Sequence, residues 1–169
     1  MRVMVRVVGL LIVLNAIFVG VMVALKRAMP SMGDEDSDEL ALVSILEGRE
    51  LKSRAGSFRG GSCLNVTSGL VLDLRGATLA PGGAFLEVRT VMGGTAVAVP
   101  EDWPVEVRSQ AYAGNVSNRI ESSPADGRDG LTIDAVAVMG SIDIGHKPQF
   151  QVEPGERWSD ELSAAPTVV

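Results

Sequence analysis

The chain has 169 residues, a length that fits one globular domain. Its hydrophobic content of 46% excludes a disordered acidic chain, and its single Cys and single His exclude a disulfide scaffold and a Cys/His metal site. The formal net charge of −6 is unevenly divided: residues 1–33 carry four basic and no acidic side chains, which leaves −10 for residues 34–169. A body of that charge offers no surface that neutralises phosphates, so we expect no nucleic-acid partner.

An uncharged run extends from Val7 to Leu25. As an α-helix, its 19 residues would be about 28 Å long, close to the ~30 Å hydrocarbon core of a bilayer. The sequence therefore predicts an uncleaved, single-pass anchor in membrane lipid, within residues 1–27. A cleaved signal peptide is the competing interpretation, but this run is longer than the usual apolar region and ends in Leu-Lys-Arg. Basic residues on both sides leave only a slight preference for a body outside the cell membrane.

Residues 28–39 form an acidic segment that contains Pro30, Gly33 and five carboxylates. Such a composition is typical of a solvated linker, so we expect a spacer that holds the following domain away from the lipid. The segment lacks the glycine and glutamate pattern of an EF-hand, so we expect no defined calcium site.

From residue 40 to 147, short runs of alternating apolar and polar residues recur, separated by turns of small residues. Leu70, Leu72 and Leu74, for example, alternate with Val71, Asp73 and Arg75. This period of two predicts β-strands with one buried face, so the body is expected to be an all-β domain. Residues 148–169 are rich in Pro and lack the pattern, so we expect a flexible C-terminal tail.

The turns share a pattern in which a large residue is followed by any residue, then Gly, then a small residue. It occurs at Phe58–Gly61, Val91–Gly94, Tyr112–Asn115 and Val138–Ser141. A Gly at each turn implies a positive φ angle or a close approach of two backbones. Repeated strand–turn–strand units predict a solenoid-like stack of short strands, and an antiparallel sandwich or a barrel remains the alternative.

Two segments carry a resemblance to a known family. Residues 69–79, which contain Asp-Leu-Arg, and residues 85–105, which contain the Met-Gly-Gly turn and Val-Pro-Glu-Asp-Trp-Pro, resemble the C-terminal domain of LiaF-like, cell wall-active antibiotics response proteins. The resemblance covers roughly residues 55–145, with Phe58–Gly61 as an upstream copy of the turn. It implies a solenoid-like β domain in a bacterial membrane protein that modulates an envelope-stress sensor kinase, and it supplies no catalytic motif. The chain departs from the family in having one membrane segment and Met before the turn glycines.

Four residues are candidates for a partner surface: Asp73, Arg75, Trp103 and Tyr112. Asp73 and Arg75 lie two apart on one strand face, where they either recognise a partner or form ion pairs on a solvated sheet. Trp103 lies in a rigid Glu-Asp-Trp-Pro turn, where it either anchors a partner or caps the β core. Tyr112 is a similar case, with a packed ring and a solvated hydroxyl.

Other chemistry finds little support in the sequence. Cys63 is expected to be a small buried hydrophobe and His146 an exposed residue at a strand end. Glycine-rich nucleotide loops and nucleophile elbows do not occur in the sequence, so we expect no cofactor and no enzymatic activity.

Three functional hypotheses follow. The first is a non-enzymatic interaction or regulatory module in the bacterial envelope stress response, in contact with a sensor kinase or another membrane protein. The second is a structural β-solenoid head that self-associates through its open end rungs, giving a homo-oligomer. The third is an envelope hydrolase that uses Asp73, Asp134 and Asp143.

Overall fold

The structure is a computed structural model that describes residues 12–14, 16, 17, 19–21, 23, 24, 27, 31–120 and 129–147. The described residues between 12 and 27 are helical and exposed. Among the residues described, no helix is both long and apolar enough to cross a bilayer. The remainder of the predicted anchor and the whole of the predicted tail, residues 148–169, lie outside the described residues.

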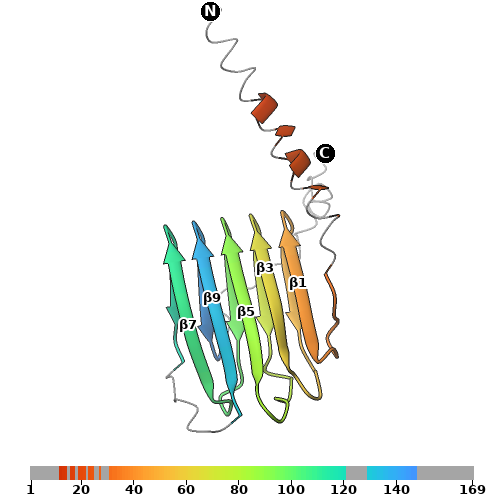
Figure 1. The fold of residues 1–169 in the computed structure, drawn as a ribbon, viewed down its shortest axis with the longest axis vertical. Helices are drawn as coiled ribbons and strands as arrows, with labels where there is room; N and C mark the ends of the chain where they lie inside the picture. The colour runs from red at the N-terminus through yellow and green to blue at the C-terminus, as the bar shows by residue number, and fades with distance from the viewer. Residues whose placement is uncertain are drawn as a thin grey trace, which may run out of the picture.

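In the described residues, ten strands alternate in sequence between two five-stranded sheets, and every strand pair within these sheets is parallel. Sheet A, in front in Figure 1, contains β1 (Glu39–Ile45), β3 (Gly60–Val66), β5 (Ala84–Val91), β7 (Val105–Tyr112) and β9 (Leu131–Val138). Sheet B contains β2 (Arg49–Lys52), β4 (Gly69–Asp73), β6 (Gly94–Ala98), β8 (Asn115–Asn118) and β10 (Ser141–Gly145). The predicted all-β class is confirmed, and parallel pairing throughout excludes an antiparallel sandwich.

Each strand of sheet A and the sheet B strand that follows it form one rung, and the part of the chain that the structure describes contains five rungs. We call the short connection inside a rung its corner and the opposite end of the stack the loop end. The rungs do not stack in sequence order, because β9 lies between β5 and β7, and β10 lies between β6 and β8. The fourth rung therefore lies at the end of the stack, and the fifth rung lies between the third and the fourth.

The corners share one backbone device. The residue that ends each sheet A strand is followed by a non-glycine residue with φ between 51° and 63°, and these residues are Leu46, Thr67, Met92, Ala113 and Met139. The glycine after three of them is required by close approach. A Cβ on Gly93 would lie 2.3 Å from the carbonyl oxygen of Ser68, and Gly140 and Gly114 meet their neighbouring rungs in the same way. Of the two predicted roles for these glycines, the structure therefore selects close approach.

The predicted upstream copy of the turn at Phe58–Gly61 is wrong. The corner of the second rung is instead Val66–Gly69, with Thr67 at the positive-φ position. Gly60 and Gly61 begin β3 at the loop end, where both have positive φ and both approach a neighbouring backbone. The sequence pattern does not distinguish the two cases, because a Gly-Gly pair fits both a corner that approaches a neighbouring rung and a strand start with positive φ angles.

The core lies between the two sheets and is aliphatic. Inward-facing residues of sheet A, such as Leu42, Leu86 and Ile133, pack with inward-facing residues of sheet B, such as Leu72 and Ile144. All five of these side chains are fully buried. Burial of stacked aliphatic ladders is the main favourable contribution to the fold.

Polar side chains close the core beneath the corners. Asn65 is fully buried, and its Nδ2 donates to the carbonyl oxygens of Ser68 at 3.0 Å and Gly94 at 2.8 Å. The hydroxyls of Thr90 and Thr95 lie 2.6 Å apart and join the same network. Because these groups find partners, their burial carries little cost, and they tie the second rung to the third.

Two strands depart from the prediction of one buried face. Val71 and Asp73 of β4 and Ala96 and Ala98 of β6 point away from the core, yet each has less than a tenth of its surface exposed. Strands buried on both faces read as continuous apolar runs, which describes Leu-Val-Leu in β4 and Ala-Val-Ala in β6.

Much of the predicted acidic spacer belongs to the β domain. Met32 pairs antiparallel with Ala41 on the outer edge of β1, and the Ser31 hydroxyl bonds the backbone NH and carbonyl of Val43, each at 3.0 Å. The Asp38 carbonyl accepts a hydrogen bond from the amide of Arg59 at 2.8 Å. Part of the segment expected to be a spacer, residues 31–38, therefore covers the edge of the first rung.

Candidate functional site

An exposed aromatic ring marks the outer face of sheet A near the loop end. In β5, Leu86 and Val88 point into the core, so Phe85 must point outward with Glu87 and Arg89. Its neighbours in register are Gly60 on one side and Thr132 on the other. Because Gly60 has no side chain, one side of the ring is left open, and 52% of Phe85 is exposed.

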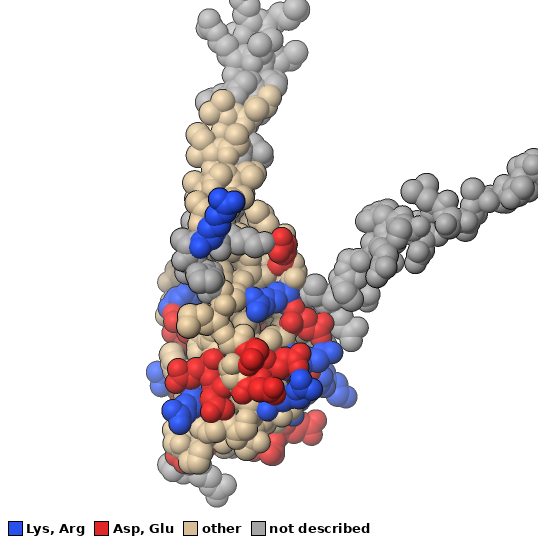
Figure 2. Space-filling model, turned by 90° about the vertical axis from the view of Figure 1, so that its right-hand side faces the viewer, with Lys and Arg blue, Asp and Glu red and all other residues tan. Residues whose placement is uncertain are grey.

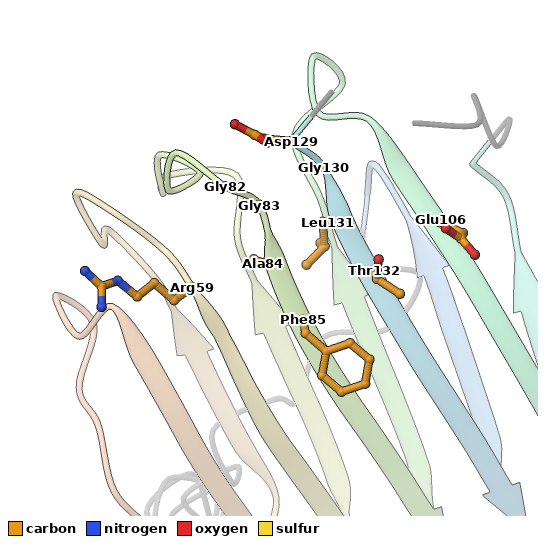
Figure 3. A pocket seen from close by; sticks show the side chains of 10 residues that line it. All are labelled: Arg59, Gly82, Gly83, Ala84, Phe85, Glu106, Asp129, Gly130, Leu131 and Thr132. Carbon is orange, nitrogen blue, oxygen red and sulfur yellow. The ribbon is translucent and has the colours of Figure 1, made fainter. Parts of the chain in front are cut away.

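The ring stands in an open pocket of about 530 Å³ (Figure 3). The lining comes from four of the five rungs and consists of Arg59, Gly82, Gly83, Ala84, Phe85, Glu106, Asp129, Gly130, Leu131 and Thr132. The pocket exists because of the rung order, since β9 brings Leu131 and Thr132 between Phe85 and Glu106.

Glycines keep the floor of the pocket free of side chains. A Cβ on Gly83 would lie 2.6 Å from the carbonyl oxygen of Gly130, and one on Gly130 would lie 2.8 Å from that of Pro104. Backbone hydrogen bonds hold this floor together, with the Ala84 amide donating to Gly130 at 3.0 Å and the Leu131 amide donating to Pro104 at 2.8 Å. A rigid backbone floor of this kind suits a pre-formed binding site.

Charged side chains of both signs line the pocket around the ring. In Figure 3 the Arg59 side chain lies on one side of Phe85, the Glu106 carboxylate lies beyond Thr132 on the other, and the Asp129 carboxylate lies at the loop end beside the glycines. Glu106 bonds Arg108 at 2.9 Å, whereas Arg59 and Asp129 form no ion pair within the described residues. The pocket therefore combines an exposed aromatic ring with a cation at Arg59 and a carboxylate at Asp129, both unpaired among the described residues, an arrangement that can bind an apolar group that carries charges of both signs.

None of the pocket residues was predicted as a site residue. The signal was present for Phe85, because the alternation of Phe85, Leu86, Glu87 and Val88 puts a large aromatic side chain on the polar face. Arg59 lies beside Phe85 because β3 pairs with β5, a register that the sequence pattern does not specify, and Asp129 and Thr132 lie there because β9 rather than β7 is the next strand.

The four predicted partner residues do not form one surface. Asp73, Arg75 and Trp103 lie at the loop end, at or after the ends of sheet B strands, whereas Tyr112 lies at the corner end of the outermost rung. None of them lines the Phe85 pocket.

Asp73 and Arg75 bind each other. The Arg75 side chain donates to both oxygens of the Asp73 carboxylate, from Nε at 2.9 Å and from Nη2 at 2.7 Å, and the Arg75 amide adds a third bond at 3.1 Å. The side chain of Asp73 is only 11% exposed and that of Arg75 is 45% exposed. These hydrogen bonds from Arg75 lower the pKa of Asp73 from its ordinary 3.8.

We expect Arg75→Met to reduce the free energy of unfolding by up to about 1 kcal/mol at neutral pH, because Arg75 is partly solvated. Since the native pKa of Asp73 is lowered, the pair stabilises the fold above pH 3.8, and this contribution is lost as the pH falls through the lowered value. Urea unfolding at several pH values would measure it, with Arg108→Met, which breaks an exposed ion pair, as the control. A difference from wild type that persists in strong acid would contradict the assignment.

Trp103 packs against a core residue. Its ring lies 6.1 Å from that of Phe58, with an interplanar angle of 25°, and Phe58 itself is fully buried. Trp103 thus lies over the core at the loop end, with only an intermediate part of its surface exposed. Tyr112, by contrast, is 60% exposed, and its hydroxyl contacts Gln110 Oε1 at 3.2 Å.

The residues considered for other chemistry are dispersed. Burial raises the pKa of the Cys63 thiol to about 12, which leaves it protonated and unreactive at neutral pH. The Nδ1 atom of His146 lies 3.1 Å from the Val99 carbonyl oxygen. Of the three carboxylates in the hydrolase hypothesis, Asp134 is on sheet A, while Asp73 and Asp143 are on sheet B and bind Arg75 and Arg119. The structure therefore does not bring these three carboxylates together.

Comparison of the chain with family models, with curated proteins and with solved structures gave no match in any of the three.

Proposed function

We propose that this chain is a membrane-anchored, non-enzymatic binding module of the bacterial envelope, which recognises a segment of a partner membrane protein. The observation that carries the proposal is the Phe85 pocket, which a half-exposed aromatic ring lines together with glycines, Arg59 and Asp129. Exposed aromatic side chains in pre-formed depressions commonly supply much of the binding energy at protein interfaces. The partner segment would carry an apolar side chain flanked by an acidic group for Arg59 and a basic group for Asp129.

The anchor and the biological setting rest on the sequence. The uncharged run from Val7 to Leu25 is long enough to span a bilayer as a helix. The resemblance of residues 55–145 to LiaF-like domains favours a role in envelope stress, with a sensor kinase as the expected type of partner. We place the body on the outer side of the membrane, in agreement with the slight charge preference at the anchor.

Recovery of partners from membranes tests the proposal. The tagged full chain, extracted from cells exposed to a cell wall-active antibiotic, should retain a sensor kinase or another envelope protein. Phe85→Ser should reduce that recovery at least about tenfold, since loss of a central aromatic contact typically costs about 2 kcal/mol or more. Arg89→Ser changes an exposed residue on the same face of β5 that does not line the pocket, and it should leave recovery unchanged. Equal recovery with Phe85→Ser, or no envelope protein with the wild-type chain, would contradict the proposal.

A self-associating head is the second candidate, favoured by the outer edge of β7. From Arg108 to Tyr112 this strand is exposed, and no strand among the described residues pairs with its outer edge. An open edge of this kind can pair with a second chain. Chemical cross-linking of the full chain in dilute detergent would yield dimers that Gln110→Pro abolishes, whereas a strict monomer would exclude this function.

A further inference from the structure

A second exposed surface, which we call the corner ridge, follows the corners at the other end of the stack. It consists of Leu46, Met92, Met139 and Tyr112, whose exposed fractions range from 46% to 60%. The positive φ angle at the first three aims their side chains away from the core. These side chains do not pack within the domain, and an exposed apolar surface of this kind is typical of a site that contacts a protein or a membrane.

Charged residues are nearly absent from this end. The corner of the first rung contains Glu47 and is followed by Arg49. The other four corners contain no charged side chain, and they are Val66–Gly69, Val91–Gly94, Tyr112–Asn115 and Val138–Ser141. The carboxylates of residues 34–38 belong to the turn that precedes β1, at the loop end. Figure 2 views the domain from the side on which β1 lies. Most acidic side chains on this side lie in the half of the domain that is remote from the helical residues.

The chain enters the domain from the corner end. Residues 31 and 32 run antiparallel to β1, and Ser31 is bonded to Val43, close to the corner. Figure 1 shows the described helical residues beyond that same end. The direction of entry therefore puts the corner ridge on the side of the domain that faces the predicted anchor.

The connection between anchor and domain is short. Only residues 26–30 separate Leu25, the last residue of the uncharged run, from Ser31. At no more than about 3.5 Å per residue, these cannot bridge more than about 20 Å. Crossing the headgroup layer uses roughly 5–8 Å of this distance. Ser31 lies beside Val43, and from there the last three residues of β1 run about 10 Å toward the anchor, so the corner of the first rung lies closer to the lipid than Ser31 does.

We infer that the corner ridge lies in the headgroup region of the bilayer, so that the domain stands on the membrane by its corners and holds the Phe85 pocket away from it. The inference rests on the proposed membrane anchor. Met and Leu side chains would enter the boundary between headgroups and acyl chains, and Tyr112 suits that boundary because its ring is apolar and its hydroxyl is polar. The uncharged corners of the second to fifth rungs avoid the cost of bringing carboxylates to an anionic surface.

Fluorescence quenching in vesicles tests this placement. The full chain would be reconstituted into vesicles of phosphatidylcholine and phosphatidylglycerol that contain a lipid with a shallow spin label. A fluorophore on Met139→Cys should shift to the blue and lose about half of its emission to the quencher. The same fluorophore on Glu101→Cys, in an exposed turn at the loop end, is the matched control and should lose little. Cys63 stays in place because it is buried and unreactive.

The outcomes separate this inference from the anchor itself. If the chain floats with vesicles but the probe at residue 139 is not quenched, the ridge does not contact lipid and the inference is overturned, while the anchor stands. A blue shift without quenching would assign the ridge to a second copy of the chain and would also overturn it. A chain that does not float overturns both the anchor and the ridge. A second comparison uses a fluorophore on Ala113→Cys. The spin-labelled lipid should quench this fluorophore in the chain with Met92 but not in the Met92→Glu variant, because a carboxylate in the ridge opposes its insertion among the headgroups.

Discussion

Replacing Gly61 with Ala is expected to abolish the stack. Gly61 has a φ of +137°, and a Cβ there would lie 1.9 Å from the carbonyl oxygen of Leu40 in the first rung. Neither the backbone conformation nor the neighbouring strand can adjust without breaking the ladder between β1 and β3. We expect a loss of more than about 3 kcal/mol, a large part of the stability of a typical domain. Circular dichroism during urea unfolding of the full chain in detergent would measure it.

Gly56→Ala is the matched control for this variant. Gly56 has no atom within 4 Å of an added Cβ and no positive φ. Its replacement should change stability by no more than about 1 kcal/mol in either direction. Equal effects of the two substitutions would show that β3 does not begin between the first and third rungs as described.

Phe58→Ala is expected to cost about 3–5 kcal/mol, because it removes a fully buried aromatic ring and leaves a cavity beneath Trp103. Phe85→Ala is the control, since it removes the same side chain from a half-exposed position and should cost no more than about 1 kcal/mol. The same denaturation experiment measures both variants. Similar costs at the two positions would mean that Phe58 is not the core residue and Phe85 is not the surface residue that the structure assigns.

The strands themselves were predictable from the sequence. Alternation in residues 85–91 and 105–108 identifies β5 and the first half of β7, because a one-face-buried strand leaves a period of two. The all-β class followed from repeating that observation along the chain. The acidic segment was misread, because five carboxylates in sequence do not reveal that the backbone at Met32 pairs with β1.

The rung order could not be predicted, because every rung presents a similar aliphatic interior and a similar corner. Met92 and Met139 occupy equivalent positions in neighbouring rungs although 46 residues separate them. No feature of the sequence within the fifth rung shows whether that rung lies at the end of the stack or between the third and fourth rungs. The Phe85 pocket depends on that order, so the sequence contained the signal for its aromatic residue but not for the residues around it.

Under these proposals the domain has two functional ends. The corner ridge, with Met92 and Met139, would face the membrane, and the pocket around Phe85 and Arg59 lies at the opposite end of the same strands. Between them, the outer face of sheet A carries charged residues such as Glu87 and Arg89. This arrangement would present the pocket to a neighbouring membrane protein at a fixed height.

The rung order and the Phe85 pocket both depend on β9 lying between β5 and β7, and disulfide cross-linking tests that order most directly. Asp134 is in register with both Glu87 and Arg108. Neighbouring strands are about 4.8 Å apart, within the reach of a disulfide, whereas strands two positions apart are separated by about 10 Å. Cysteine pairs at residues 87 and 134 and at residues 134 and 108 should therefore cross-link on mild oxidation, and a pair at residues 87 and 108 should not. Cross-linking of residues 87 and 108 instead would show rungs stacked in sequence order and would contradict both the fold and the pocket.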